Sequence, residues 1–174
     1  AVIHTISIMR NCRKIAEAEG ISDVDLELLL TAAAYHDSGF LETYDRNEPL
    51  GCRIAEEALP RFDFTTEQIR RVHGMIMATQ PPQTPRNKLE MILCDADLFY
   101  LGGDQYDDIA ESLYQELQLH QKQMTRNEWL EMQTHSLEEH QYFTDFAKQQ
   151  RGVKKQLILE KLRAQLKHSN RKGA

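Results

Sequence analysis

Hydrophobic residues recur three and four positions apart along most of the chain, which is the spacing of amphipathic α-helices. Segments in which apolar and polar residues simply alternate do not stand out, so strands are not expected. The pattern predicts helices over residues 3–16, 23–34, 49–59, 65–77, 87–98, 106–119, 126–148 and 153–166. We therefore expect an all-α, single-domain helical bundle that spans residues 1–174.

Glycine, proline and capping residues divide these helices. Gly20 ends the first helix, and either Ser22 or Asp23 caps the second. Inward positions of the fourth helix are expected at Ile69, Val72, Ile76 and Met77. The last helix, at about 151–168, is basic and amphipathic, and we expect it to dock on the acidic remainder of the chain and to allow a homodimer.

Composition and charge narrow the class of protein. Of the 174 residues, 41% are hydrophobic and 28% are charged, as in ordinary globular domains. The net charge is −6, and residues 148–174 hold nine basic residues and one acidic residue, so the part before them is strongly acidic. An acidic body does not attract a nucleic acid polymer, and a phosphorylated substrate would need a bound cation.

The remaining composition argues for a cytoplasmic protein without a membrane span. Apolar runs do not reach 18 residues, and the first ten residues lack the pattern of a secretory signal. Cys12, Cys52 and Cys94 are widely separated, which fits reduced thiols. Because the chain starts at Ala1 rather than at methionine, we expect it to be a fragment of a longer protein.

Metal-binding residue types fall at the ends or inside of apolar helices. His4 lies on the first helix, on the side expected to face the core, and His36-Asp37 ends the apolar run LELLLTAAAYHD. Asp95 lies inside EMILCDADLFYLG, where an unpaired carboxylate would be destabilising by several kcal/mol. A metal ion is one way to supply the missing counter-charge. Two imidazoles and two carboxylates suit Mn, Fe, Co, Ni or Zn better than Mg.

These residues, in this order, resemble the HD-domain metal-dependent phosphohydrolases. The segments AAAYHDSGF, GCRIAEEALP, CDADLFYLGG and HQYFTDFA look like the small bacterial members in particular. The resemblance implies an all-α fold in which His4, His36, Asp37 and Asp95 hold one divalent metal ion, of the kinds above or Mg. Dinuclear relatives carry further histidines between the His-Asp pair and the last acid, where this chain offers only His73, which we expect not to ligate.

The chemistry implied is hydrolysis of a phosphomonoester or phosphodiester of a small metabolite, with a nucleotide favoured. Asp97 and Glu48 are the candidate catalytic residues, as acceptors of the water proton. Arg46, Arg53 and Lys88 are the candidates for binding the phosphate.

The alternative is a non-catalytic sensor or regulatory module that binds a metal or a nucleotide. It is favoured by Asn47, which stands where many relatives have histidine. An iron-dependent oxygenase would need more histidines than the chain offers.

Overall fold

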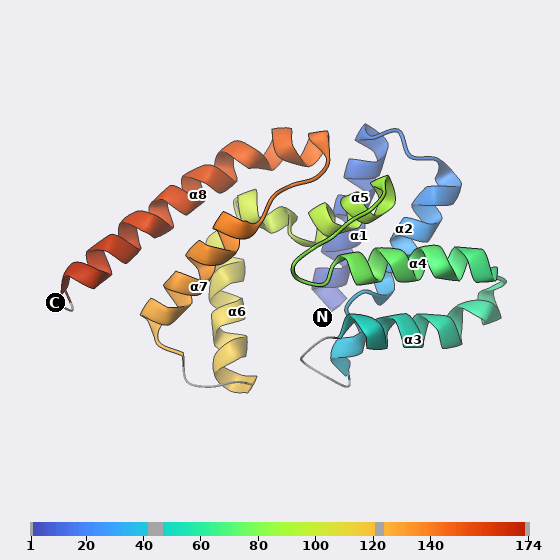
Figure 1. Cartoon of the computed structure of the whole chain (residues 1–174), viewed down its shortest axis with the longest axis horizontal. Coiled ribbons are helices and arrows are strands. Elements are labelled where there is room, and N and C mark those ends of the chain that lie inside the picture. The colour runs from blue at the N-terminus through green and yellow to red at the C-terminus, as the bar shows by residue number, and fades with distance from the viewer. Residues whose placement is uncertain (1, 42–46, 121–123, 173–174) are drawn as a thin grey trace. The chain divides into compact units, whose positions relative to one another are not determined.

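All secondary structure in the described part of the chain is helical. The structure, a computed structural model, describes residues 2–41, 47–120 and 124–172, and these contain helices and no strand (Figure 1). The prediction of an all-α fold is confirmed. The chain forms two compact units, which we call unit 1 (residues 1–98 and 143–146) and unit 2 (residues 99–142 and 147–174).

Unit 1 contains the helices that carry the candidate chemistry. They are α1 (Val2–Ala18), α2 (Asp23–Tyr35), α3 (Glu48–Ala58), α4 (Thr66–Ala78) and α5 (Lys88–Asp97), with short 3₁₀ turns at Ser38–Leu41 and Leu59–Phe62. Helix α1 packs on α2 and α5, and α4 packs on α2, α3 and α5 (Figure 1). The fully buried side chains at the centre of this arrangement are Ile8, Ile15, Leu28, Leu29, Val72, Ile76, Ile92 and Leu93.

Side-chain caps mark where α2, α4 and α5 begin. Ser22, and not Asp23, caps α2, because its hydroxyl accepts the backbone N–H of Asp25. Thr65 and Gln68 form a reciprocal capping box at the start of α4. Asn87 caps α5 through the N–H of Glu90. These three helices therefore start at polar residues that satisfy some of their first free N–H groups.

Unit 2 is built from α6 (Tyr106–His120), α7 (Arg126–Glu139) and most of α8 (Asp145–Lys172), preceded by a 3₁₀ turn at Phe99–Gly102. Basic residues of α8 pair with acidic residues of the other two helices: Lys161 contacts Asp107 on α6, and Arg163 contacts Glu138 on α7. The basic helix expected at about 151–168 lies within α8.

Three expectations from the pattern differ from the structure. The helix expected over 126–148 ends at Glu139, residues 140–144 are not helical, and α8 already begins at Asp145. The break occurs where the backbone N–H groups of Phe143 and Thr144 donate to the buried carboxylate of Asp95 instead of to a preceding turn. Met77, expected to point inward, is exposed.

None of the helices in the described residues is both long and apolar enough to cross a membrane.

Candidate metal centre

His36 is held at the C-terminal end of α2 in one orientation. The small residues Ala32 and Ala33 let this end of the helix pack closely, and His36 is only 2% exposed. Its Nδ1 lies 2.9 Å from the carbonyl oxygen of Ala33, and because a carbonyl can only accept, Nδ1 carries the proton. The other nitrogen, Nε2, is buried and makes no hydrogen bond within the described part of the chain. Once Nε2 loses its proton, its electron pair is available to a metal ion, which would take the place of the proton there.

Two carboxylates and a second imidazole surround this nitrogen. His36 Nε2 lies 3.2 Å from Asp37 Oδ1 and 3.6 Å from Asp97 Oδ1. His4 Nε2 lies 3.4 Å from Asp37 Oδ2 and 3.5 Å from Asp97 Oδ1. We call these four residues the His-Asp cluster. Metal bonds of about 2.0–2.2 Å place neighbouring ligand atoms on the order of 3–3.5 Å apart, so the spacing suits one ion.

The His-Asp cluster is buried on one side and open on the other. The side chain of His4 is 44% exposed and that of Asp37 is 29% exposed, whereas His36 is almost completely covered. The expectation that His4 faces the core is therefore wrong in part: it points to the cluster, but from the solvent side. His4 and Asp37 are therefore the members of the cluster that face solvent.

The charges of the cluster depend on one another. Burial alone would lower the pKa of His36, but the carboxylates of Asp97 and Asp37 raise it to about 9. Burial alone would raise the pKa of Asp97, yet its contacts with His36 and His4 hold that pKa well below its usual range. Burial raises the pKa of Asp37, an effect that the two histidines oppose. Without a metal, the proton on His36 is the counter-charge for the Asp97 carboxylate.

The structure does not bring Asp95 to the cluster, although the sequence suggested it as a ligand. Asp95 is completely buried, and its carboxylate accepts hydrogen bonds from the N–H of Phe143 and from the N–H and hydroxyl of Thr144. These hydrogen-bond donors stabilise the buried negative charge of Asp95, for which the sequence had suggested a metal ion. Asp97, two residues later and expected to accept the water proton, occupies the place expected for Asp95.

The position of Asp97 in the fold explains why the sequence pattern pointed to Asp95, and not to Asp97, as the ligand. It is the last residue of α5, just as His36 caps the end of α2, and the two helix ends meet at the cluster. Helical spacing could have indicated this, because a ligand shared with His36 must lie where α5 emerges from the core rather than among its buried residues.

The other predicted residues of the site lie in different places. Glu48 is buried at the start of α3, and its Oε2 makes no hydrogen bond with the residues that the structure describes. The backbone of Gly51, one turn later, runs close to the carbonyl oxygens of Tyr35 and His36. Arg53 is on the same helix and is exposed. Arg46 lies outside the described residues.

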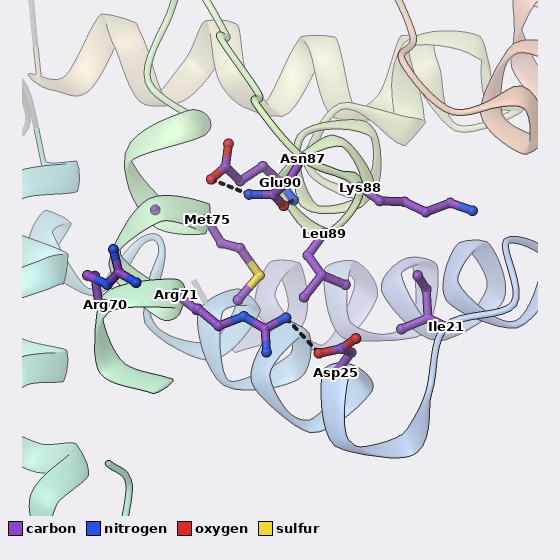
Figure 2. Close-up of a pocket in the computed structure, with 10 residues that line it drawn as sticks. Ile21, Asp25, Arg70, Arg71, Met75, Asn87, Lys88, Leu89 and Glu90 are labelled. Carbon is purple, nitrogen blue, oxygen red and sulfur yellow. Dashed lines mark hydrogen bonds and ion pairs between the residues drawn. The ribbon is translucent and has the colours of Figure 1, made fainter. Parts of the chain in front are cut away.

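Lys88 is at the opposite end of α5 from Asp97. With a rise of 1.5 Å per residue, the two residues are about 13 Å apart along the helix axis. The ammonium group of Lys88 donates to the carbonyl oxygen of Glu19 and lies 3.3 Å from its carboxylate. The start of α5 lines a hollow of about 550 Å³ with Met75 and the Arg71–Asp25 ion pair, and Figure 2 shows Lys88 extending away from Met75. The structure does not place Lys88 at the His-Asp cluster.

His73, the additional histidine between the His-Asp pair and the last acid, is not a member of the cluster. Within residues 2–41, 47–120 and 124–172, the Nε2 of His73 is buried and makes no hydrogen bond. In the same residues, the group of three or more His, Cys, Asp or Glu side chains close enough to share a metal ion consists of His4, His36 and Asp97. Asp37 completes it through its contacts with both histidines.

Comparison with known protein families finds a match to the region of the chain that contains the His-Asp cluster. The family model for the HD domain matches residues 1–100, which include all four residues of the His-Asp cluster. The chain belongs to the HD domain family. A comparison with curated proteins finds no match.

A solved structure shares the fold of this HD domain protein. It is the crystal structure of a predicted HD superfamily hydrolase from an uncultured Thermotogales bacterium, with a TM-score of 0.63 and 20% sequence identity. The similarity covers 97% of this chain and 80% of the other chain.

Proposed function

We propose that this HD domain protein is a metal-dependent phosphohydrolase that cleaves a phosphomonoester or phosphodiester of a small metabolite, a nucleotide in the first instance. The observation that carries the proposal is the buried Nε2 of His36. It makes no hydrogen bond among the described residues and lies 3.2 Å from Asp37 Oδ1 and 3.6 Å from Asp97 Oδ1, with His4 at metal-ligand spacing beside them. Membership of the HD domain family and the fold shared with a predicted HD superfamily hydrolase support the reaction class.

The residues of the cluster fit a divalent ion. His4, His36, Asp37 and Asp97 would hold it with two nitrogen and two oxygen donors, a mixed set suited to Mn, Fe, Co, Ni or Zn, and usable by Mg. The hydrogen bond from His36 Nδ1 to Ala33 fixes the ring that would ligate. Once bound, the ion would activate a water molecule and stabilise negative charge on the phosphoryl oxygens.

The protein's own groups would then handle the proton and the phosphate. Glu48 is the candidate acceptor of the water proton, because it is a buried acid on the helix that runs past the His36 backbone, and its Oε2 makes no hydrogen bond among the described residues. Arg53, on the exposed side of the same helix, and Arg46, from its place in the sequence, are the candidates for holding phosphate oxygens. Asp97 belongs in this proposal to the metal ligands and not to the catalytic residues. Lys88 is not a candidate for binding the phosphate, because it contacts Glu19 at the other end of α5.

The test combines metal content with a phosphate-release screen. The protein is purified without chelator, its metals are measured by mass spectrometry, and it is assayed on nucleotides and sugar phosphates with Mn²⁺, Co²⁺ and Mg²⁺. We expect about one transition metal per chain and release of phosphate from at least one substrate. The variant His36→Ala/Asp37→Ala should lose both, whereas Arg70→Ala, an exposed position on α4 paired with Glu67, should keep both.

Two results would contradict the proposal in different ways. Stoichiometric metal without turnover of any phosphate ester would favour the alternative, a non-catalytic sensor module. Absence of metal after incubation with each of the three ions would reject the metal-dependent activity and leave a nucleotide-binding regulatory module as the alternative.

A further inference from the structure

The carboxylate of Asp95 binds the segment that leads into α8. Its Oδ1 accepts the N–H of Phe143 at 2.8 Å, and its Oδ2 accepts the N–H of Thr144 at 2.8 Å and the Thr144 hydroxyl at 2.7 Å. Both residues are in unit 1, although they lie 48 and 49 positions further along the chain. Three charge-assisted hydrogen bonds to a fully buried carboxylate form a rigid connection.

The same segment is bound by a second acid. The N–H of Phe146 donates to Glu19 Oε1 at 3.2 Å, just after the end of α1. Because the first N–H groups of a helix have no partner within the helix and carry partial positive charge, the start of α8 is a suitable place for two carboxylates. The segment 143–146 is thus held to unit 1 by acids from α5 and from the end of α1.

The hydrogen bonds to Asp95 are made at the last turn of α5, which also carries Asp97. Ala96, between the two aspartates, accepts a hydrogen bond of 3.2 Å at its carbonyl oxygen from Asn11 Nδ2 of α1, the helix that carries His4. The helix itself holds this end weakly, since the N–H of Leu98 reaches the carbonyl oxygen of Cys94 at 3.4 Å. Helix ends fray unless other groups fix them.

We propose that Asp95 and Thr144 are positioning residues that hold the end of α5 so that the Asp97 carboxylate stays within reach of both histidines. The two acids of the segment Asp95-Ala96-Asp97 then have separate roles. Asp97 faces the cluster, and Asp95 is bound by the segment 143–146. This inference rests on the proposed function, because it assigns Asp97 to a metal-binding set.

The test removes a single hydroxyl far from the cluster in sequence. Thr144→Val keeps the size of the side chain and the backbone N–H that donates to Asp95 Oδ2, but it deletes the hydroxyl that donates to the same oxygen. Thr144→Ser keeps that hydroxyl. Thr79→Val is the matched control, because Thr79 is also buried in unit 1 and its hydroxyl bonds to the Ile76 carbonyl oxygen instead of to Asp95. Thr144→Ala serves as a second deletion in case the valine side chain prevents folding, which circular dichroism will show.

Co²⁺ binding, followed by the visible absorption of the bound ion, is the readout, and it requires no substrate. Loss of an outer contact of this kind weakens metal affinity by roughly 10- to 100-fold, and we expect a reduction in this range for Thr144→Val and Thr144→Ala, with a changed absorption spectrum. Thr144→Ser and Thr79→Val should bind as the wild type does. Equal affinity in Thr144→Val and Thr79→Val would overturn the positioning role. Failure of the wild type to bind Co²⁺ would instead reject the proposed function, and this inference with it.

Discussion

Raising the pH from 6.5 to 8.5 should destabilise the metal-free protein through His36. The pKa of this group is about 9 in the folded protein, against an ordinary value of 6.5, so the folded state holds the proton more tightly than the unfolded state does. The stabilisation is therefore fully present below pH 6.5 and is lost as the pH rises towards 9. One pKa unit corresponds to about 1.4 kcal/mol, and over this interval the loss amounts to about 2 kcal/mol.

The assay is thermal or urea unfolding in the presence of a chelator at several pH values. A loss of this size lowers the Tm by roughly 5–8 °C for a chain of this length. The pH is kept at or below 8.5 because burial raises the pKa of all three cysteines from an ordinary value of 9.0, and these thiols would add their own destabilisation in more alkaline solution. Bound metal should reverse the trend, since it competes with the proton for Nε2.

The variant His36→Gln provides the control. It is expected to be less stable than the wild type at pH 6.5 and to lose most of the pH dependence. If the wild type is equally stable at both pH values, or if His36→Gln retains the wild-type slope, the proton on His36 is not the counter-charge of Asp97 and the electrostatic account of the cluster is incorrect.

Three further outcomes are expected. Lys88→Ala should leave phosphate release unchanged, because Lys88 contacts Glu19 at the other end of α5; a loss of kcat would contradict this placement. Leu29→Ala, at a fully buried position of α2, should lower the free energy of unfolding by about 2–5 kcal/mol in urea titrations. Burial and the nearby Lys155 lower the pKa of His140 to about 4, so stability should fall as the pH drops below 6.5, and His140→Phe should reduce this acid sensitivity in the same unfolding assay.

Local patterns were sufficient to predict the helices of unit 1. Its helices are short, their apolar positions are regularly spaced, and polar caps such as Ser22, Thr65 and Asn87 mark their starts. The C-terminal part was harder to predict for a physical reason. The sequence HQYFTDFA continues a helical pattern, and only the tertiary contact with Asp95 takes the N–H groups of Phe143 and Thr144 out of a helix.

The same contact explains the exchange of the two aspartates. A buried acid in an apolar helix must have partners, and the sequence could show that Asp95 needs them but not which donors would supply them. Backbone N–H groups from a segment 48 residues away cannot be foreseen from the residues around Asp95. His4, His36 and Asp37, in contrast, lie at one cluster as the resemblance implied, because the ends of α1 and α2 are fixed by the local pattern.

The most direct test of the account is Mn²⁺ binding to Asp97→Asn, measured by isothermal titration calorimetry. Asp25→Asn is the matched control: the same substitution in the same unit, at a carboxylate that pairs with Arg71. We expect one Mn²⁺ site per chain in the wild type and in Asp25→Asn, and an affinity at least about 100-fold weaker in Asp97→Asn, since a charged ligand is lost. Wild-type affinity in Asp97→Asn would contradict the assignment of Asp97 to the metal centre.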